Sequence, residues 1–217
     1  MKSPTIWVAA VMLGCIALQA LAADPPLTRN QALAQASSTD LKQRRAAVER
    51  LGEVGVMSDV RALVKALHDG DELTRALAEA SIWRVWGRSG DAKVDELFER
   101  GVREMNNGAL ESAIETFTSV IKRKPEFAEG WNKRATLYFF AGEFDKSLKD
   151  CDEVLKRNPL HFGVLAGYGQ IYVRLDQAER ALGYFQRALK INPNMQGVAQ
   201  SVEVLKELID RRGGRVI

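Results

Sequence analysis

The chain carries few side chains that could do chemistry, and their spacing does not gather them. Its two histidines, His68 and His161, have no cysteine and no second histidine nearby. A zinc site takes several His or Cys ligands at short, regular spacings, and no such spacing occurs. No Ser or Cys nucleophile motif, phosphate loop or dinucleotide fingerprint is present. The sequence therefore predicts no metal, no cofactor and no enzymatic activity, because an active site would have to be assembled from scattered residues.

The charge balance argues against a nucleic-acid partner. The 217 residues include 31 Lys and Arg against 28 Asp and Glu, so the two signs nearly cancel. The longest basic run, 122–124, is placed where a helix would end, and cations there suit the helix dipole. Nucleic-acid binding normally requires a basic patch or stripe, which this sequence lacks.

The elements that position these residues follow a pattern that is repeated between positions 94 and 193. Pro125, Pro159 and Pro193 are each 34 residues apart, and other residue classes keep the same step. The columns are Gly101, Ala135 and Gly169; Leu97, Trp131 and Leu165; Ala113, Ser147 and Ala181; Phe117, Cys151 and Phe185; and, at the expected turn, Gly108, Gly142 and Asp176. A fixed period of this length predicts stacked helix–turn–helix units, in which each proline ends a second helix.

This pattern resembles the tetratricopeptide repeat in length and in residue classes, with three units in register over residues 91–195. The resemblance implies an all-α, right-handed α-solenoid of helical hairpins. The chain is also similar to a group of small exported proteobacterial proteins, most closely in residues 127–136 and 161–163. That second likeness implies a fold and a compartment, and no activity.

The first residues are predicted to be a targeting segment. Lys2 precedes an uncharged apolar run, Ile6–Leu21, and residues 20–22 form a small-x-small cleavage site. We therefore expect residues 1–22 to be a signal peptide, cleaved near Ala22, and the mature protein to be periplasmic without stable membrane insertion. The alternative is a retained membrane anchor. After cleavage Cys151 is the remaining cysteine, so it cannot form an intramolecular disulfide and is predicted to be a small buried hydrophobe.

Residues 23–90 are predicted to be a second helical segment with a weaker period of 31 residues. The equivalent positions are Asp40 and Asp71, Arg44 and Arg75, Ala47 and Ala78, Leu51 and Ile82, and Val54 and Val85. This pattern resembles a HEAT-type repeat. Since repeat units bury their faces against neighbours, we expect this segment to pack on the first tetratricopeptide unit, with Trp83 and Trp86 in that junction.

Two further features concern the ends of the array. Asp91 is placed to cap the helix that begins the first unit. Residues 196–217 are predicted to be a C-terminal capping helix and tail, because apolar residues recur at helical spacing over 196–210. A capping helix covers the apolar face that the last unit would otherwise expose.

Arg134 faces the partner helix of its own hairpin. One subclass of these repeats has an Asn-x-Arg-small sequence in the first helix and an aspartate near the end of the second. Asn132, Arg134, Ala135 and Asp150 match it. The resemblance implies a structural ion pair between Arg134 and Asp150, rather than a catalytic arginine.

The resemblance also implies a binding face, since the first helices of the units line the concave side and bind peptides or proteins. The corresponding residues are Phe98, Val102, Met105, Asn132, Lys133, Thr136, Phe139, Phe140, Gln170 and Arg174. Family members that clamp a terminal carboxylate carry Lys, Asn and Arg there, whereas this sequence starts with Phe98 and Val102. We therefore expect a non-catalytic scaffold or adaptor with an apolar groove and a polar rim. The alternatives are that flanking helices cover these side chains as core, and that the protein is a membrane-anchored structural or assembly subunit.

Overall fold

A computed structural model describes residues 25–213, and within that range the chain contains helices and no strands. The predicted signal peptide, residues 1–22, lies outside the described residues. The N-terminal helices are α1 (Arg29–Gln35), α2 (Leu41–Val54), the short 3-10 helix η1 (Met57–Asp59), α3 (Val60–Ala66) and α4 (Glu72–Trp86). Among the described residues, no helix is both long enough and apolar enough to cross a bilayer.

Six helices then form three hairpins, and a last helix follows them. Their bounds are α5 (Ala92–Asn106) with α6 (Leu110–Arg123), α7 (Ala128–Phe140) with α8 (Phe144–Arg157), α9 (Phe162–Arg174) with α10 (Ala178–Ile191), and α11 (Gln196–Gly213). The predicted turn column is confirmed. Gly108, Gly142 and Asp176 connect the two helices of each hairpin with positive φ angles of 73°, 76° and 54°. Glycine adopts this conformation without a steric cost, and aspartate is among the residues that tolerate it.

The small column lets the two helices of a hairpin approach closely. A Cβ atom placed on Gly169 would come within 2.4 Å of the Phe185 ring, and one on Gly101 within 2.9 Å of the Phe117 ring. Both phenylalanines are buried. The sequence period thus reflects a physical constraint, because the aromatic column fills the space that the small column leaves open.

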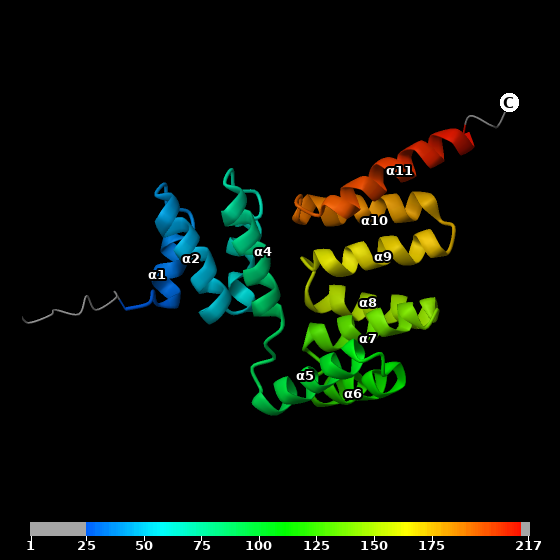
Figure 1. Ribbon diagram of the computed structural model, residues 1–217, viewed down its shortest axis with the longest axis horizontal. Helices are drawn as coiled ribbons and strands as arrows, with labels where there is room; N and C mark the ends of the chain where they lie inside the picture. Colours follow the sequence, from blue (N-terminus) through cyan, green and yellow to red (C-terminus); the bar gives the residue numbers. More distant parts are fainter. Residues whose placement is uncertain (1–24, 214–217) are drawn as a thin grey trace, which may run out of the picture.

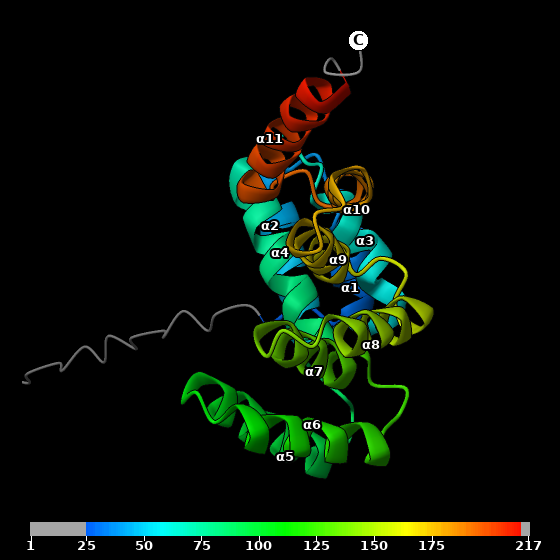
Figure 2. The same ribbon diagram turned by 90° about the vertical axis from the view of Figure 1, so that its right-hand side faces the viewer.

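The hairpins are stacked one on another from α5 to α11 in Figure 1, whereas α1 to α4 stand beside the stack and cross the ends of its helices. Figure 2 shows α5 and α6 at the opposite end of this stack from α11. The predicted capping role of α11 is confirmed, since it packs along α10 and buries Val202 and Leu205. Asp91 caps α5 as expected, accepting hydrogen bonds from the N–H groups of Lys93 and Val94.

The expected docking of the N-terminal helices on the first hairpin is wrong, because they dock on the third. The ring of Trp83 lies 5.4 Å from that of Phe162, and Trp86 stacks on His161 at 4.2 Å. Phe162 belongs to the same core cluster as Leu51 and Leu63 from the N-terminal helices. Trp86 is buried at this junction, whereas Trp83 remains 37% exposed.

The repeat columns explain why the N-terminal helices pack on the third hairpin. Leu160, Phe162 and Ile191 form the apolar edge on which the N-terminal helices pack. The residues 34 positions earlier in these columns are Glu126, Ala128 and Arg157. The second hairpin thus presents charged or small side chains where the third presents large apolar ones. Apolar burial favours the edge that has them.

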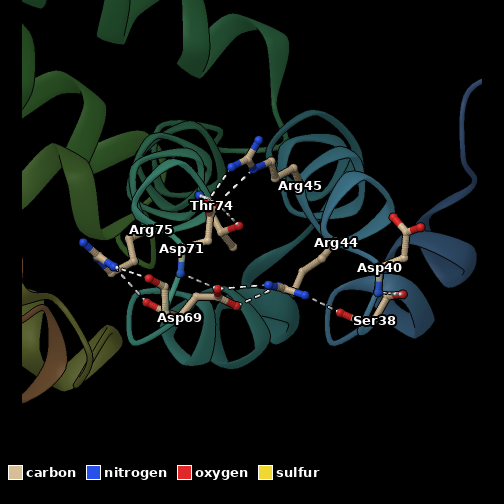
Figure 3. Close-up of polar contacts among 9 residues, drawn as sticks. Ser38, Asp40, Arg44, Arg45, Asp69, Asp71, Thr74 and Arg75 are labelled. Atoms are coloured by element: carbon tan, nitrogen blue, oxygen red, sulfur yellow. Dashed lines mark hydrogen bonds and ion pairs between the residues drawn. The ribbon is translucent and has the colours of Figure 1, made fainter.

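Hydrogen bonds and ion pairs between arginine and aspartate side chains connect the N-terminal helices (Figure 3). Asp40 and Asp71 are equivalent in the 31-residue period, and their side chains cap α2 and α4. Arg45 makes a bidentate pair with Asp71, with distances of 2.6 and 2.8 Å, and this pairing holds the pKa of Asp71 well below its usual range. Arg44 bridges to Asp69 of the next unit at 2.8 Å. The period therefore corresponds to structurally equivalent positions, while the likeness to HEAT repeats remains an interpretation.

The equivalent arginine of the second N-terminal unit, Arg75, contacts the segment between α10 and α11. Arg75, which is equivalent to Arg44, donates from Nε to Oδ1 of Asn194 at 2.9 Å. Asn194 in turn donates from Nδ2 to the carbonyl of Leu67 at 2.9 Å. The segment between α10 and α11 therefore takes the place that a further N-terminal unit would occupy.

Candidate functional site

A groove lies between the first helices of the second and third hairpins. It holds a hollow of about 150 Å³, whose walls come from α7 and α9 and whose floor includes residues of α8. The lining residues are Asn132, Ala135, Thr136, Phe139, Phe140, Ser147, Cys151, Gly163, Val164, Ala166, Gly167, Gln170 and Ile171. Each of these side chains is apolar or uncharged, so the hollow suits an apolar group flanked by hydrogen-bonding groups.

Half of the predicted partner-binding residues meet in this groove. Asn132, Thr136, Phe139, Phe140 and Gln170 all line it. Phe140 is 67% exposed, which is unusual for a phenylalanine that ends a well-packed helix. Its ring lies 5.7 Å from that of Phe139 in an edge-to-face contact. The flanking helices do not cover this part of the concave face.

The two predicted cations of the groove differ in their surroundings. The Arg174 guanidinium lies 5.8 Å from the centre of the Phe139 ring, so it flanks the groove at the C-terminal ends of α7 and α9. Lys133 is half-buried on α7, one residue beyond Asn132. Neither cation has an ion-pair partner among residues 25–212, whose side chains the structure describes.

The predicted residues of the first hairpin are not part of the groove. Phe98 is buried, with its ring 5.6 Å from Phe117 and 5.2 Å from Phe127, so its assignment to the binding surface is corrected. Val102 and Met105 pack partly buried against the same core cluster. The reason is that α5 is an end helix, and its apolar face must fill the first hairpin's own core.

The cysteine and serine in the floor of the groove are not activated as nucleophiles. Cys151 is buried as predicted, and burial raises the pKa of its thiol to about 12. A thiol with so high a pKa is a poor nucleophile at neutral pH. Ser147 donates its hydroxyl to the carbonyl of Ala135 at 2.8 Å, which satisfies it within the hairpin. Within the described residues no group of His, Cys, Asp and Glu side chains could hold a metal ion.

A buried pair that the sequence analysis missed lies at one end of the groove. Glu129 of α7 and His161, which precedes α9, are 3% and 0% exposed, and their Oε1 and Nε2 atoms are 2.6 Å apart. Nδ1 of His161 accepts the N–H of Val164, so the ring proton resides on Nε2 and is donated to the carboxylate. The sequence contained a signal for this pair. Glu129 lies in the 127–136 stretch and His161 in the 161–163 stretch, and the two positions are separated by close to one repeat.

This pair fixes one wall of the groove. Asn132 donates from Nδ2 to Oε2 of Glu129 at 2.9 Å, and no hydrogen bond to its amide oxygen occurs among the described residues. On the opposite side, the Trp86 ring stacks on His161 at 4.2 Å. A continuous set of contacts therefore runs from α4 through His161 and Glu129 to the Asn132 side chain of the groove.

Residues 132–195, which include most of the second hairpin's first helix and all of the third hairpin, match the family model described as tetratricopeptide repeat. This part of the chain is a tetratricopeptide repeat array. The hairpin α5–α6 continues the same 34-residue columns, and we refer to the three hairpins as tetratricopeptide units from here on.

Two relatives are similar to about half of this chain. A tetratricopeptide repeat-containing protein of Rhizobium etli is 32% identical over 122 residues, which cover 56% of this chain and 60% of that protein. Hsp70-Hsp90 organizing protein 1 of Glycine max is 25% identical over 117 residues, covering 54% of this chain and 20% of that protein. The chain therefore spans less than two thirds of the length of these relatives.

The similar structures show the fold alone. The tetratricopeptide domain of Sgt2 from Aspergillus fumigatus superposes with a TM-score of 0.54 at 16% identity, over 58% of this chain and 85% of that chain. The first tetratricopeptide domain of Spaghetti (RPAP3), solved with an HSP90 peptide, gives a TM-score of 0.53 at 21% identity, over 55% and 96%. These matches are to interaction repeats and indicate no enzyme family.

The predicted ion pair of the second tetratricopeptide unit is confirmed. Arg134 donates from Nε and Nη2 to the two carboxylate oxygens of Asp150, at 2.7 and 2.8 Å. Its Nη1 donates to the hydroxyl of Thr118 in the first unit at 3.0 Å. The side chains of Arg134 and Asp150 are 14% and 6% exposed. The arginine thus joins the helices of one unit to the preceding unit and is already fully engaged.

Proposed function

We propose that this protein is a non-catalytic adaptor that binds a segment of a partner protein in the groove between α7 and α9, in the periplasm. The observation that carries the proposal is the Phe140 ring, which is 67% exposed beside a hollow lined by uncharged side chains. Exposed aromatic rings next to a hollow are typical of interaction surfaces, and such rings often contribute most of the binding energy.

The chemistry of the groove limits what this partner segment can be. An apolar side chain would enter the hollow between Phe139, Phe140 and Ile171. The Asn132 amide oxygen and the exposed Gln170 amide would bond to the polar backbone of the bound segment. Lys133 and Arg174 would face acidic groups on it. We therefore infer a segment that combines apolar and acidic residues.

The similar proteins support a peptide partner in general terms. One solved neighbour carries an HSP90 peptide, and relatives include Hsp70-Hsp90 organizing proteins. Fold-level likeness does not transfer a particular ligand. Phe98 and Val102 stand where a carboxylate clamp would begin, and both are part of the first unit's core or packed against it. We therefore do not extend a terminal-carboxylate preference to this chain.

The compartment is proposed from the sequence of residues 1–22, which has the pattern of a cleaved signal peptide. N-terminal sequencing of the protein from a cell-envelope preparation tests this directly. A start near Ala23 supports a periplasmic adaptor. An intact N-terminus that remains with the membrane fraction supports the second candidate, a membrane-anchored subunit of an envelope complex.

The groove is tested by Phe140→Ser, with Val204→Ser as the matched control. Val204 on α11 is 65% exposed, so the two variants each replace one exposed apolar side chain, at different places. Purified proteins would be checked by circular dichroism and used to capture partners from envelope extract, identified by mass spectrometry. We expect Phe140→Ser to lose specific partners that the wild-type protein and Val204→Ser retain. Equal capture by all three proteins would locate the binding surface elsewhere.

A further inference from the structure

A second recess lies outside the concave groove, between the N-terminal helices and the edges of the first two tetratricopeptide units. It consists of two adjoining hollows of about 510 and 220 Å³, which share Met57, Arg157 and Asn158. It exists because the N-terminal helices pack on the third unit, leaving the edges of the other two units uncovered. We call these two hollows together the junction cleft.

Cations dominate the lining of the junction cleft. Its charged lining residues are Arg61, Arg88, Lys124, Arg157 and Glu126. The single acid, Glu126, lies 3.9 Å from the Lys124 ammonium, too far for a hydrogen bond. Arg157 pairs with Glu153 at 2.6 Å, so Arg61 and Arg88 are the lining cations without an acidic partner among the described residues, and the lining keeps a net positive charge.

Two of these cations need separate comment. Arg88 donates to the backbone carbonyls of Gly52 and Gly55, both at 2.7 Å. These neutral acceptors fix the guanidinium in place without cancelling its charge. Arg61 is exposed and makes no ion pair with any residue that the structure describes. The field in the junction cleft therefore favours anionic groups.

Two buried donors next to the junction cleft also lack acceptors. Nε1 of Trp86 and Nδ2 of Asn158 have no hydrogen-bond partner among the described residues, although both side chains belong to residues only 3% exposed. Oδ1 of Asn158 accepts the N–H of Leu160, which fixes the orientation of the amide and leaves Nδ2 as its unpaired donor. Trp86 lines the smaller hollow and Asn158 lines both. Buried donors are usually paired, so these two favour a ligand that brings acceptor oxygens.

The junction cleft also has an apolar component. Met57 is 47% exposed at the boundary of the two hollows, and the adjacent Val56 is 48% exposed. Phe127 and Leu160 add apolar lining on the array side. A small inorganic anion would leave this apolar surface in water. A polypeptide with both carboxylates and apolar side chains would satisfy both parts of the cleft.

We propose that the junction cleft binds an acidic segment of a second protein partner, with carboxylates near Arg61 and Lys124 and an apolar side chain on Met57. This site is distinct from the α7–α9 groove, and its existence does not depend on the function proposed for that groove. It would let the protein hold two segments at once, on the concave face and at the junction of its two arrays.

The test uses a fluorescein-labelled peptide, Glu-Leu-Glu-Glu-Leu-Glu, and its neutral counterpart, Gln-Leu-Gln-Gln-Leu-Gln, with the full chain. Binding is followed by fluorescence anisotropy at low and at moderate salt. We expect saturable binding of the acidic peptide and at least about tenfold weaker binding by the Arg61→Glu/Lys124→Glu variant, because like charges would then oppose the ligand. The matched control is Lys149→Glu, an exposed charge reversal on α8.

Several outcomes would overturn the proposal. These are no saturable binding of the acidic peptide, equal binding of the neutral peptide, or an equal loss in Lys149→Glu. Loss of binding in Phe140→Ser with retention in Arg61→Glu/Lys124→Glu would assign the peptide to the groove instead. Displacement of the peptide by inorganic phosphate at comparable charge concentration would indicate nonspecific anion attraction. Circular dichroism checks the fold, and Lys124→Gln alone replaces the double variant if that variant does not fold.

Discussion

Nε2 of His161 donates to Oε1 of Glu129 at 2.6 Å, and the two buried side chains join the second tetratricopeptide unit to the third. Burial alone would raise the pKa of the Glu129 carboxyl, but the His161 side chain, the Lys133 charge and the Asn132 amide together outweigh burial and lower it. The carboxylate form is therefore the one that the fold stabilises. Because Asn132 lines the groove, the pair also sets the chemistry of the proposed binding surface.

The first prediction concerns the pH dependence of this pair. A carboxyl whose pKa is lower in the folded state stabilises the fold above its unfolded pKa, and this contribution is lost as the pH falls through the folded value. We expect Glu129→Gln to lower the free energy of unfolding at neutral pH by about 1–2 kcal/mol, because a charge-assisted hydrogen bond becomes a neutral one.

The measurement is urea unfolding of both proteins at neutral pH and at several values below 4.5, the ordinary pKa of glutamate. The difference between wild type and Glu129→Gln should shrink steadily over that acidic range. A difference that stays constant with pH would mean that Glu129 is not ionised in the folded protein.

The second prediction compares two glycines on α9. A Cβ on Gly169 would lie 2.4 Å from the buried Phe185 ring, whereas a Cβ on Gly167 would meet no atom within 4 Å. Gly169→Ala should destabilise the protein by about 1–3 kcal/mol through overpacking. Gly167→Ala should be neutral or stabilising by up to about 1 kcal/mol, because alanine favours the helix. Thermal melts of the two variants check this, and similar melting temperatures would contradict the close approach of α9 and α10.

The third prediction concerns Arg134 and Asp150. Asp150→Ala leaves a largely buried guanidinium without its carboxylate, which should cost about 3–5 kcal/mol. Replacing both residues with apolar ones of similar size should recover part of that loss. The readout is a double-mutant cycle from denaturant unfolding, with the exposed Asp145→Ala as a control that should change little. Additive losses would show that the two side chains are not coupled.

The repeat columns made much of this fold predictable. A turn at Asp176, a small residue at Gly169 and a capping helix after Pro193 all follow from one period, because each unit must satisfy the same packing constraints. The Arg134–Asp150 pair could also be predicted from the sequence, since it forms within one hairpin. The sequence also predicted five of the residues that line the groove between α7 and α9. Phe98 is instead buried, because an end unit lacks a neighbour to complete its core.

The predicted docking of the N-terminal helices is wrong because it assumes that each repeat unit packs on the unit next to it in the sequence. Ile191, Arg157 and Arg123 occupy one column, and only the residue of the third unit is apolar. Comparing side chains within that column would have favoured the third unit. The Glu129–His161 pair escaped notice for a related reason, because its two residues are not in the same column and meet only across the stacked units.

The last prediction follows from that column. Ile191→Arg gives the third unit the residue that the second unit has at Arg157, so the edge contacted by the N-terminal helices loses apolar surface and gains a charge. Ile191 packs against the same core cluster as Leu67, and its carbonyl accepts a hydrogen bond from Nε2 of His68. Gln186→Arg is the control, since it places the same side chain at an exposed position on the same helix.

We expect Ile191→Arg to loosen α4 from the array while the three tetratricopeptide units stay folded. Hydrogen exchange of the α4 amides should accelerate at least about tenfold, as expected if docking is weakened by roughly 1.4 kcal/mol or more. Exchange in α7 and α8 should change little, because the N-terminal helices dock on the third unit and not on the second. If α4 keeps its wild-type protection, or if α7 and α8 lose theirs to the same extent, the N-terminal helices are held by something other than the apolar edge of the third unit.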